Sequence, residues 1–546
     1  MARTAPARML RRIVAEHATA AEIAAATAAG RVAGAPSRRT VLGGLAAGVG
    51  LAATTGVAAA STAQASTASG TPPVVAIVGA GIAGLTAALQ LADHGIACAV
   101  YEADTRVGGR MYSNPAGAYW ADGQTSEWGG EMIDTPHVVM QSLASRFGLP
   151  LDDLRAAEPA GSTEVYRFDG AYYTYAQASA DFKKLKPVIQ QDEATFDWPV
   201  AWNSANGPGA VTLSNMSIHE WIATRVPGGH SSPFGQLLDV AYTTEFGVDT
   251  HASSALGIVG LLGYQPVPNG FALFGESDTR YRVRGGNQRI PQAIAAALPP
   301  GTVRHGWRLT KVAAAAGGRQ SLTFTVDGCS QTVLADHTVL ALPVGVLQRV
   351  NLSTAGFDSR KLAGIAAMTM GQNCKLSMQF DTRHWNASGP WGIASGSTMS
   401  DTGYQTSWDS SRAQPGGKGI LTVYAGGGHA ADFTPSTPFR TAADPQIAAY
   451  AQAALAQLEP VFPGLTAHWT GKATLAAWPL NPNARGSYSA WPPGYAHRYA
   501  GYEGVRQGNT HFAGEHTSEA AQGYMEGGAE SGQRAADEIL GDLGVL

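Results

Sequence analysis

The chain has 546 residues, 45% of them hydrophobic and 14% charged, and a length of this order predicts two packed domains rather than one core. Its formal net charge is −4, but residues 1–65 hold seven arginines and two glutamates, so the remainder carries −9. Because the chain after residue 65 is acidic and has no runs of basic residues, nucleic acid is excluded as an expected partner. The negative charge is compatible with a cationic substrate.

The first predicted element is an export signal. Arg38-Arg39 precedes a weakly apolar stretch of alanine and glycine, and Ala63-Gln64-Ala65 offers a small-residue cleavage site. This combination is typical of a twin-arginine signal. A membrane anchor is the alternative, but no stop-transfer charges follow the stretch. We expect residues 1–65 to direct secretion and to be removed without stable membrane insertion, while the role of residues 1–36 stays open.

A strand, a glycine turn and a helix follow the linker. The apolar run 74–78 predicts a buried parallel strand, and it leads into Gly79-Ala80-Gly81-Ile82-Ala83-Gly84 and a helix ending near Gly95. In such a turn Gly79 makes the bend, Gly81 lets the backbone approach a pyrophosphate, and Gly84 allows close packing. The helix N-terminus offers N–H groups to phosphates. These residues predict a dinucleotide site.

A second predicted strand, 97–101, ends in Glu102, which is placed to accept hydrogen bonds from the adenosine ribose. The following residues, Ala103-Asp104-Thr105-Arg106-Val107-Gly108-Gly109-Arg110, resemble the second fingerprint of the flavin amine oxidase superfamily. In that family the glycines and the arginine, here Gly109 and Arg110, surround the FAD pyrophosphate. The resemblance therefore implies FAD rather than a nicotinamide cofactor.

The same resemblance returns near residue 510. Thr510–Thr517 looks like the family's strand and turn at the ribityl chain, where Glu515 would bind a hydroxyl. The helix that opens at Met525 would direct its N-terminal amides at the flavin pyrimidine ring and stabilise negative charge there. Between these ends, the stretch from Val303 to Val312 would contact the adenine.

These resemblances imply an α/β fold with a Rossmann-like FAD-binding domain and an α+β substrate-binding domain. The FAD-binding domain would be discontinuous, with residues 66–145, 277–352 and 476–546. Residues 146–276 and 353–475 would form the substrate-binding domain.

Lys375 lies in an alternating stretch that predicts a strand. It resembles the family lysine that holds a water against flavin N5, and a cation there favours electron transfer to O₂. The alternative is an exposed strand lysine. Tyr488 and Tyr524 match two family positions that form an aromatic cage for a neutral amine, and Trp478 resembles a tryptophan at the flavin's dimethylbenzene edge, although it could equally be ordinary core.

Ser487 stands where animal monoamine oxidases carry the cysteine that links FAD, so we expect noncovalent FAD. The chain's three cysteines form no CxxC or Cys/His motif, which predicts neither a disulfide framework nor a metal site.

The segment 127–134 corresponds to the family loop on the substrate side of the flavin. Glu131 and Asp134 could attract a second ammonium, as in polyamine oxidases, or could bind the local backbone, and the sequence leaves both readings open. L-amino acid oxidases carry an arginine in this loop for the substrate carboxylate. No arginine stands between Gln124 and Leu143 here.

We therefore expect an oxidase that converts an amine to an imine, with O₂ reduced to H₂O₂. The alternatives are an L-amino acid oxidase that uses Arg282 or Arg284, a desaturase or cyclase acting on a secreted metabolite, and a non-catalytic FAD-binding module. The sequence leaves open the particular amine, the natural electron acceptor and the oligomeric state, with a homodimer as one option.

Overall fold

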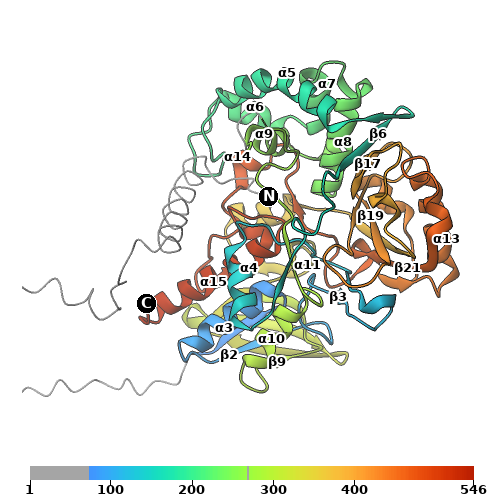
Figure 1. The fold of residues 1–546 in the computed structure, drawn as a ribbon. Coiled ribbons are helices and arrows are strands. Elements are labelled where there is room, and N and C mark those ends of the chain that lie inside the picture. Colours follow the sequence, from blue (N-terminus) through green and yellow to red (C-terminus); the bar gives the residue numbers. More distant parts are fainter. Residues whose placement is uncertain (1–72, 267–269) are drawn as a thin grey trace, which may run out of the picture. The chain divides into compact units, whose positions relative to one another are not determined.

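The computed structural model describes residues 73–266 and 270–546 (Figure 1). The expected export signal, with Arg38, Arg39 and the site at 63–65, lies outside these residues. Within them, no helix combines the length and the apolar composition that a membrane span needs.

A parallel sheet of five strands forms the centre of the part that is expected to bind FAD. The strands, in spatial order, are β23 (Thr510–Phe512), β13 (His337–Leu340), β1 (Val75–Val78), β2 (Cys98–Tyr101) and β9 (Val303–Arg304). β1 is buried on both faces, as its continuous apolar sequence predicts. The strands come from three stretches of the chain far apart in sequence. This topology confirms the expected α/β fold.

Two helices lie together against this sheet: α3 (Ile82–Asp93) and α15 (Met525–Asp542), coloured blue and red in Figure 1. They approach so closely that a Cβ added at Gly532 would lie 2.2 Å from the carbonyl oxygen of Ala83. Two further helices pack into the same core, α4 (Val138–Arg146) and α10 (Arg289–Ala297).

A smaller sheet lies on the parallel sheet and shares a core with it through Tyr101, Val312 and Phe324. Its strands are β12 (Cys329–Ala335), β11 (Gln320–Val326), β10 (Arg308–Ala314) and β14 (Asn351–Thr354).

The part that is expected to bind the substrate contains a mixed sheet of eight strands. In spatial order they are β20 (Phe439–Thr441), β21 (Trp469–Ala477), β16 (Cys374–Phe380), β19 (Gly419–Ala425), β18 (Thr406–Asp409), β17 (Ala394–Ser400), β6 (Thr163–Phe168) and β7 (Ala171–Tyr173). Helix α13 (Pro445–Leu458) packs against β21.

Helices in the upper part of Figure 1 complete this part. They are α5 (Tyr175–Glu193), α6 (Pro208–Asn215), α7 (Ile218–Arg225), α8 (Pro233–Phe246) and α9 (Ala255–Gly263). Capping residues in the sequence determine where several of these helices begin. Thr174 with Gln177 and Ser217 with Glu220 form capping boxes for α5 and α7, and Ser232 caps α8.

The remaining elements are short connections between these layers. They are β3 (Ser113–Asn114), β4 (Ser126–Glu127), β5 (Leu151–Asp153), β8 (Tyr281–Val283), α11 (Val344–Leu347), α12 (Ser359–Ala367), β15 (Thr369–Met370), β22 (Ser489–Ala490) and α14 (Ala496–Tyr499).

Candidate active site

One cavity of about 320 Å³ is lined by residues of the parallel sheet, of both helices against it and of the eight-stranded sheet. Gly81 and Met525 stand at the N-termini of α3 and α15, and Lys375 and Trp408 reach it from β16 and β18. Sequence segments hundreds of residues apart therefore share one site.

The first glycine turn has space only for glycine at two positions. Gly79 has φ +106°, and a Cβ there would lie 2.6 Å from the carbonyl oxygen of Ala341. A Cβ at Gly84 would lie 2.0 Å from the carbonyl oxygen of Gly79. Gly81 lines the cavity, and a Cβ there would meet no protein atom within 4 Å. The turn leaves room for a ligand beside Gly81.

Glu102 holds this turn from the end of β2. Its carboxylate accepts hydrogen bonds from the backbone N–H of Ala80 and of Asp104, each at 2.7 Å. Burial raises the pKa of the Glu102 carboxyl, against the effect of these hydrogen bonds. Glu102 also lines the cavity, so the side chain that shapes the turn is within reach of a bound ribose.

Arg110 and Glu515 form an ion pair of 2.9 Å on the cavity wall. Glu515 also accepts hydrogen bonds from the N–H and hydroxyl of Ser489 and from the N–H of Gly523. Burial alone would raise the pKa of Glu515, but Arg110 and the hydrogen bond from the Ser489 hydroxyl hold it below its ordinary value. Glu515 therefore links three chain segments. A Cβ added at Gly109 would lie 3.3 Å from the Cα of Gly81, so the two glycine stretches lie close together.

The geometry fits a flavin dinucleotide. Neither α3 nor α15 has a side-chain cap, so the first N–H groups of both helices are left for a ligand, and Gly81, Tyr524 and Met525 line the cavity there. Two helix N-termini and a glycine turn suit the negative charge of a pyrophosphate and of a reduced flavin ring.

Val303 differs from expectation. It lies in β9 at the sheet edge, paired with Val100, and packs into the core below α3 and α10 instead of lining the cavity. The same segment lines the cavity four residues later, through Trp307, Arg308 and Leu309. The N–H of Trp307 donates to the carbonyl oxygen of Glu102, which brings this stretch to the dinucleotide side.

Lys375 is buried within β16, which rules out the exposed strand lysine. Its Nζ donates to the carbonyl oxygen of Gly129 at 2.7 Å and to Oε2 of Glu131 at 2.9 Å, and it lines the cavity. Glu131 also lies 3.5 Å from Arg282. Burial would raise the pKa of Glu131, but the two cations lower it overall. Glu131 is thus the counter-ion of Lys375 and Arg282.

Asp134 forms a hydrogen bond with the protein backbone and does not reach the cavity. It accepts a hydrogen bond from the N–H of Thr279 at 2.8 Å and does not line the cavity. The two candidate carboxylate clamps also lie outside the cavity lining. Arg282 is buried and donates to the carbonyl oxygens of Ser410 and Arg412, whereas the largely exposed Arg284 pairs with Asp152.

Aromatic side chains gather at the end of the cavity next to Lys375. Tyr488 donates to the carbonyl oxygen of Thr244 at 2.7 Å and accepts a hydrogen bond from Tyr424 at 3.2 Å. The ring of Trp408 lies edge-on to Tyr424, and Tyr524 lines the same cavity. Because its hydroxyl is fixed on both sides, Tyr488 presents a rigid wall.

Trp478 combines the two roles that the sequence left open. It lines the cavity, its Nε1 donates to the carbonyl oxygen of Trp128 at 2.7 Å, and its ring packs edge-on against Phe439.

Three residues at this aromatic end were not predicted from the sequence: Glu245, Trp408 and Tyr424. Burial and the nearby carboxylate of Glu245 raise the pKa of Tyr424. One feature of the sequence could have indicated Glu245, which is an acid directly before Phe246 near the end of the stretch that forms α8. Trp408 and Tyr424 had none, because they look like other aromatic residues in alternating strands.

Comparison with known proteins gives a consistent result. The family model described as flavin containing amine oxidoreductase matches residues 82–540. The chain is 27% identical over 483 residues to an L-amino acid dehydrogenase of Synechocystis sp., covering 86% of this chain and 94% of that protein. It is 24% identical to an L-amino-acid oxidase of Mus musculus (87% and 71% covered) and to Polyamine oxidase 4 of Oryza sativa subsp. japonica (86% and 88% covered).

Solved structures share the fold. Cyclohexylamine oxidase from Brevibacterium oxydans IH-35A superposes with a TM-score of 0.70 at 21% identity, covering 87% of this chain and 100% of that chain. Putrescine oxidase bound to putrescine superposes with a TM-score of 0.67 at 21% identity, covering 86% and 99%.

Proposed function

This chain belongs to the family of flavin-containing amine oxidoreductases, and from that premise we propose that it oxidises amines that carry no α-carboxylate. For a primary amine the overall reaction is amine plus O₂ plus water to aldehyde, ammonia and H₂O₂. The amine loses a hydride from carbon and a proton from nitrogen to give an imine, which water hydrolyses. FAD, held by the glycine turn and the N-termini of α3 and α15, would supply the acceptor for this hydride, and O₂ would be the final electron acceptor.

The observation that supports this substrate class is the lining of the aromatic end. Glu245 is an acid there, and the three arginines of the lining, Arg106, Arg110 and Arg308, belong to the stretches around the glycine turns and Trp307. Lys375, the cation next to this end, already pairs with Glu131. A carboxylate brought into this apolar pocket without a further cationic partner keeps a desolvation cost of several kcal/mol. A substrate ammonium would instead be attracted by Glu245.

The chain's own residues would act as follows. Tyr488 and Tyr524 would exclude water from the amine and favour its neutral form. Lys375, which donates a hydrogen bond to Glu131, would stabilise negative charge that develops on O₂. The FAD would be noncovalent, since the described residues that line the cavity include neither cysteine nor histidine, and Ser487 occupies the position of the linking cysteine.

Matched substrate pairs test the proposal. We expect phenethylamine to exceed phenylalanine, and cadaverine to exceed lysine, by on the order of 10²-fold in kcat/KM, measured by peroxide release. Amino acids that outperform the amines in both pairs would refute the proposal and favour the L-amino acid oxidase alternative.

Glu245→Gln tests the role of the acid, because it keeps the side-chain size and removes the charge. If Glu245 attracts the distal ammonium of a diamine, kcat/KM for cadaverine should fall at least about tenfold, roughly 1.4 kcal/mol. Phenethylamine has no second ammonium and is the internal control. Equal losses for both substrates would assign Glu245 to the structure of the pocket instead of to diamine binding.

We further propose that the enzyme is exported in folded form, on the basis of the sequence Arg38-Arg39 and of FAD synthesis in the cytoplasm. Replacement of both arginines by lysine should retain active enzyme inside the cell. Unchanged activity outside the cell would exclude the twin-arginine route.

A further inference from the structure

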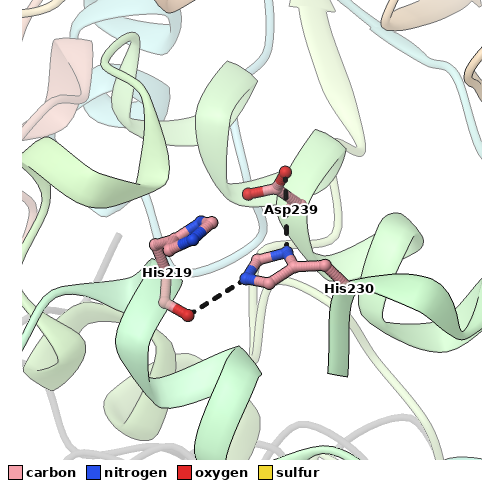
Figure 2. Close-up of side chains that lie close together, drawn as sticks. All are labelled: His219, His230 and Asp239. Atoms are coloured by element: carbon pink, nitrogen blue, oxygen red, sulfur yellow. Dashed lines mark hydrogen bonds and ion pairs between the residues drawn. The ribbon is translucent and has the colours of Figure 1, made fainter. Parts of the chain in front are cut away.

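Two histidines and one aspartate meet among the helices of the part that is expected to bind the substrate (Figure 2). His219 is the second residue of α7, His230 lies in the turn Gly229–Ser231, and Asp239 stands in the middle of α8. Each offers one ligand atom, and these atoms lie within 4.8 Å of one another. None of the three residues lines the cavity.

The hydrogen bond of His230 determines which of its two ring nitrogens can bind a metal ion. Nε2 lies 3.1 Å from the carbonyl oxygen of His219. Because a carbonyl can only accept, Nε2 carries the hydrogen, and in the neutral ring Nδ1 holds a lone pair. This Nδ1 lies 3.9 Å from Oδ2 of Asp239, which is too long for a hydrogen bond but close enough for two ligands of one ion.

Asp239 is held in the same way. Its Oδ1 accepts a hydrogen bond from the hydroxyl of Thr250, which orients the carboxylate and leaves Oδ2 towards His230. Metal-binding imidazoles and carboxylates are commonly fixed by outer hydrogen bonds of this kind. No lysine or arginine among the described residues forms an ion pair with Asp239, so the carboxylate has no competing cation.

His219 completes the group. Its ring is exposed and stacks on His230, with ring centroids 4.0 Å apart and planes 21° apart. In Figure 2 the ring of His219 lies beside the ring of His230, and the Asp239 carboxylate lies above the ring of His230. An exposed side chain can turn at little cost to direct a nitrogen at a shared ion.

A second cluster, His337, His511 and Asp542, fits a cation less well. There Arg506 already donates to Asp542 at 2.6 Å, so a positive charge occupies the carboxylate. The cluster of His219, His230 and Asp239 is therefore the better candidate for binding a cation.

We propose that His219, His230 and Asp239 bind a divalent transition metal ion, Zn²⁺ being the best match. Two imidazole nitrogens and one carboxylate oxygen are typical zinc ligands, and a water would complete the tetrahedron. The sequence predicted no metal site, because the three residues stand 11 and 9 positions apart on separate elements and match no metal motif. A bound ion would join α7, the turn at His230 and α8 into one rigid unit.

The test uses full-length, FAD-loaded protein without a histidine tag, freed of metal by EDTA and titrated with Zn²⁺ by calorimetry. We expect one equivalent to bind, and His230→Ala or Asp239→Asn to weaken binding at least tenfold. His251→Ala is the matched control, because His251 is an exposed histidine in the adjacent turn Thr250–Ala252 and outside the cluster. It should bind Zn²⁺ like the wild type.

Zn²⁺ should also raise the Tm of the wild type and of His251→Ala but not of His230→Ala, because a ligand stabilises only a protein that binds it. Amine oxidation by the variants monitors their folding. If His230→Ala does not fold, the exposed His219→Ala replaces it. The proposal is overturned if the wild type shows no saturable zinc site, or if His230→Ala and His219→Ala bind as the wild type does.

Discussion

At the scale of single residues, the ion pairs around Lys375 decide what this lysine can do. Glu131 is the shared ion-pair partner of two buried cations, Lys375 and Arg282, so removing either cation changes the charge beside the cavity. The carbonyl oxygen of Gly129 fixes the position of the ammonium group. The charge of Lys375 is therefore localised, which is what stabilisation of a small anion requires.

Lys375→Met keeps the length of the side chain and deletes this charge. Reduction of the flavin by amine without oxygen should change little, whereas reoxidation by O₂ should slow at least about tenfold, roughly 1.4 kcal/mol. Stopped-flow spectroscopy separates the two half-reactions. Lys472→Met is the control, since Lys472 also donates to a carbonyl, that of Tyr119, but lies outside the cavity lining. An unchanged reoxidation rate would exclude Lys375 as the oxygen-activating group.

The buried carboxyl group of Glu127 makes the free energy of unfolding depend on pH. Burial raises the pKa of this fully buried carboxyl to about 8. As the pH rises from the ordinary value near 4.5 to 8, the unfolded chain loses this proton and the folded chain retains it, so stability falls across that interval. Glu127→Gln removes the titration and can preserve both partners, Ser113 and the N–H of Asn287.

Relative to the wild type, Glu127→Gln should therefore gain stability between pH 5 and pH 8.5, with an upper bound of about 5 kcal/mol. Urea unfolding at the two pH values measures this change. Glu519→Gln, at an exposed acid, should leave the pH dependence as it is. Parallel pH profiles for the wild type and Glu127→Gln would contradict the raised pKa.

At the scale of elements, the contact between α3 and α15 is the most constrained. A Cβ at Gly532 would meet the backbone of α3, which cannot move like a flexible side chain. Gly532→Ala should therefore destabilise the protein by about 1–3 kcal/mol, although alanine favours helices. Gly541→Ala in the same helix meets no atom within 4 Å and should be neutral or stabilising by up to about 1 kcal/mol. Equal Tm values for both variants would contradict this close packing.

The sequence predicts those elements whose pattern is local. The apolar run before Gly79 and the alternation around Lys375 indicate strands, and β1 and β16 are found there. Family, fold class and flavin cofactor, which the fingerprint resemblance implied, are confirmed. The site is less predictable, because Trp408 and Tyr424 meet only through the pairing of β18 with β19, and nothing local marks that register. Val303 shows the same limit, since the stretch 303–312 was expected at the adenine and reaches the cavity through Trp307, Arg308 and Leu309, whereas the side chain of Val303 packs against the core.

At the scale of the whole molecule, the mode of FAD attachment is open to a direct experiment. Denaturation with acid should release yellow flavin into the supernatant, because Ser487 cannot form a thioether and no cysteine is found among the described residues that line the cavity. Absorbance of the supernatant and the pellet measures the release. Flavin that stays with the pellet after complete denaturation would show a covalent link to another residue.

The order of the strands in the parallel sheet also limits when the protein can fold during synthesis. β1 is made early, yet its neighbour β13 begins more than 250 residues later, and β23 begins at Thr510. Of the two helix N-termini at the cavity, that of α3 is also made early, whereas that of α15 is made only after β23. Nearly the whole chain must therefore leave the ribosome before the cavity can form and retain its cofactor. In a prematurely terminated chain the apolar faces of β1 would stay uncovered, and proteases could recognise them.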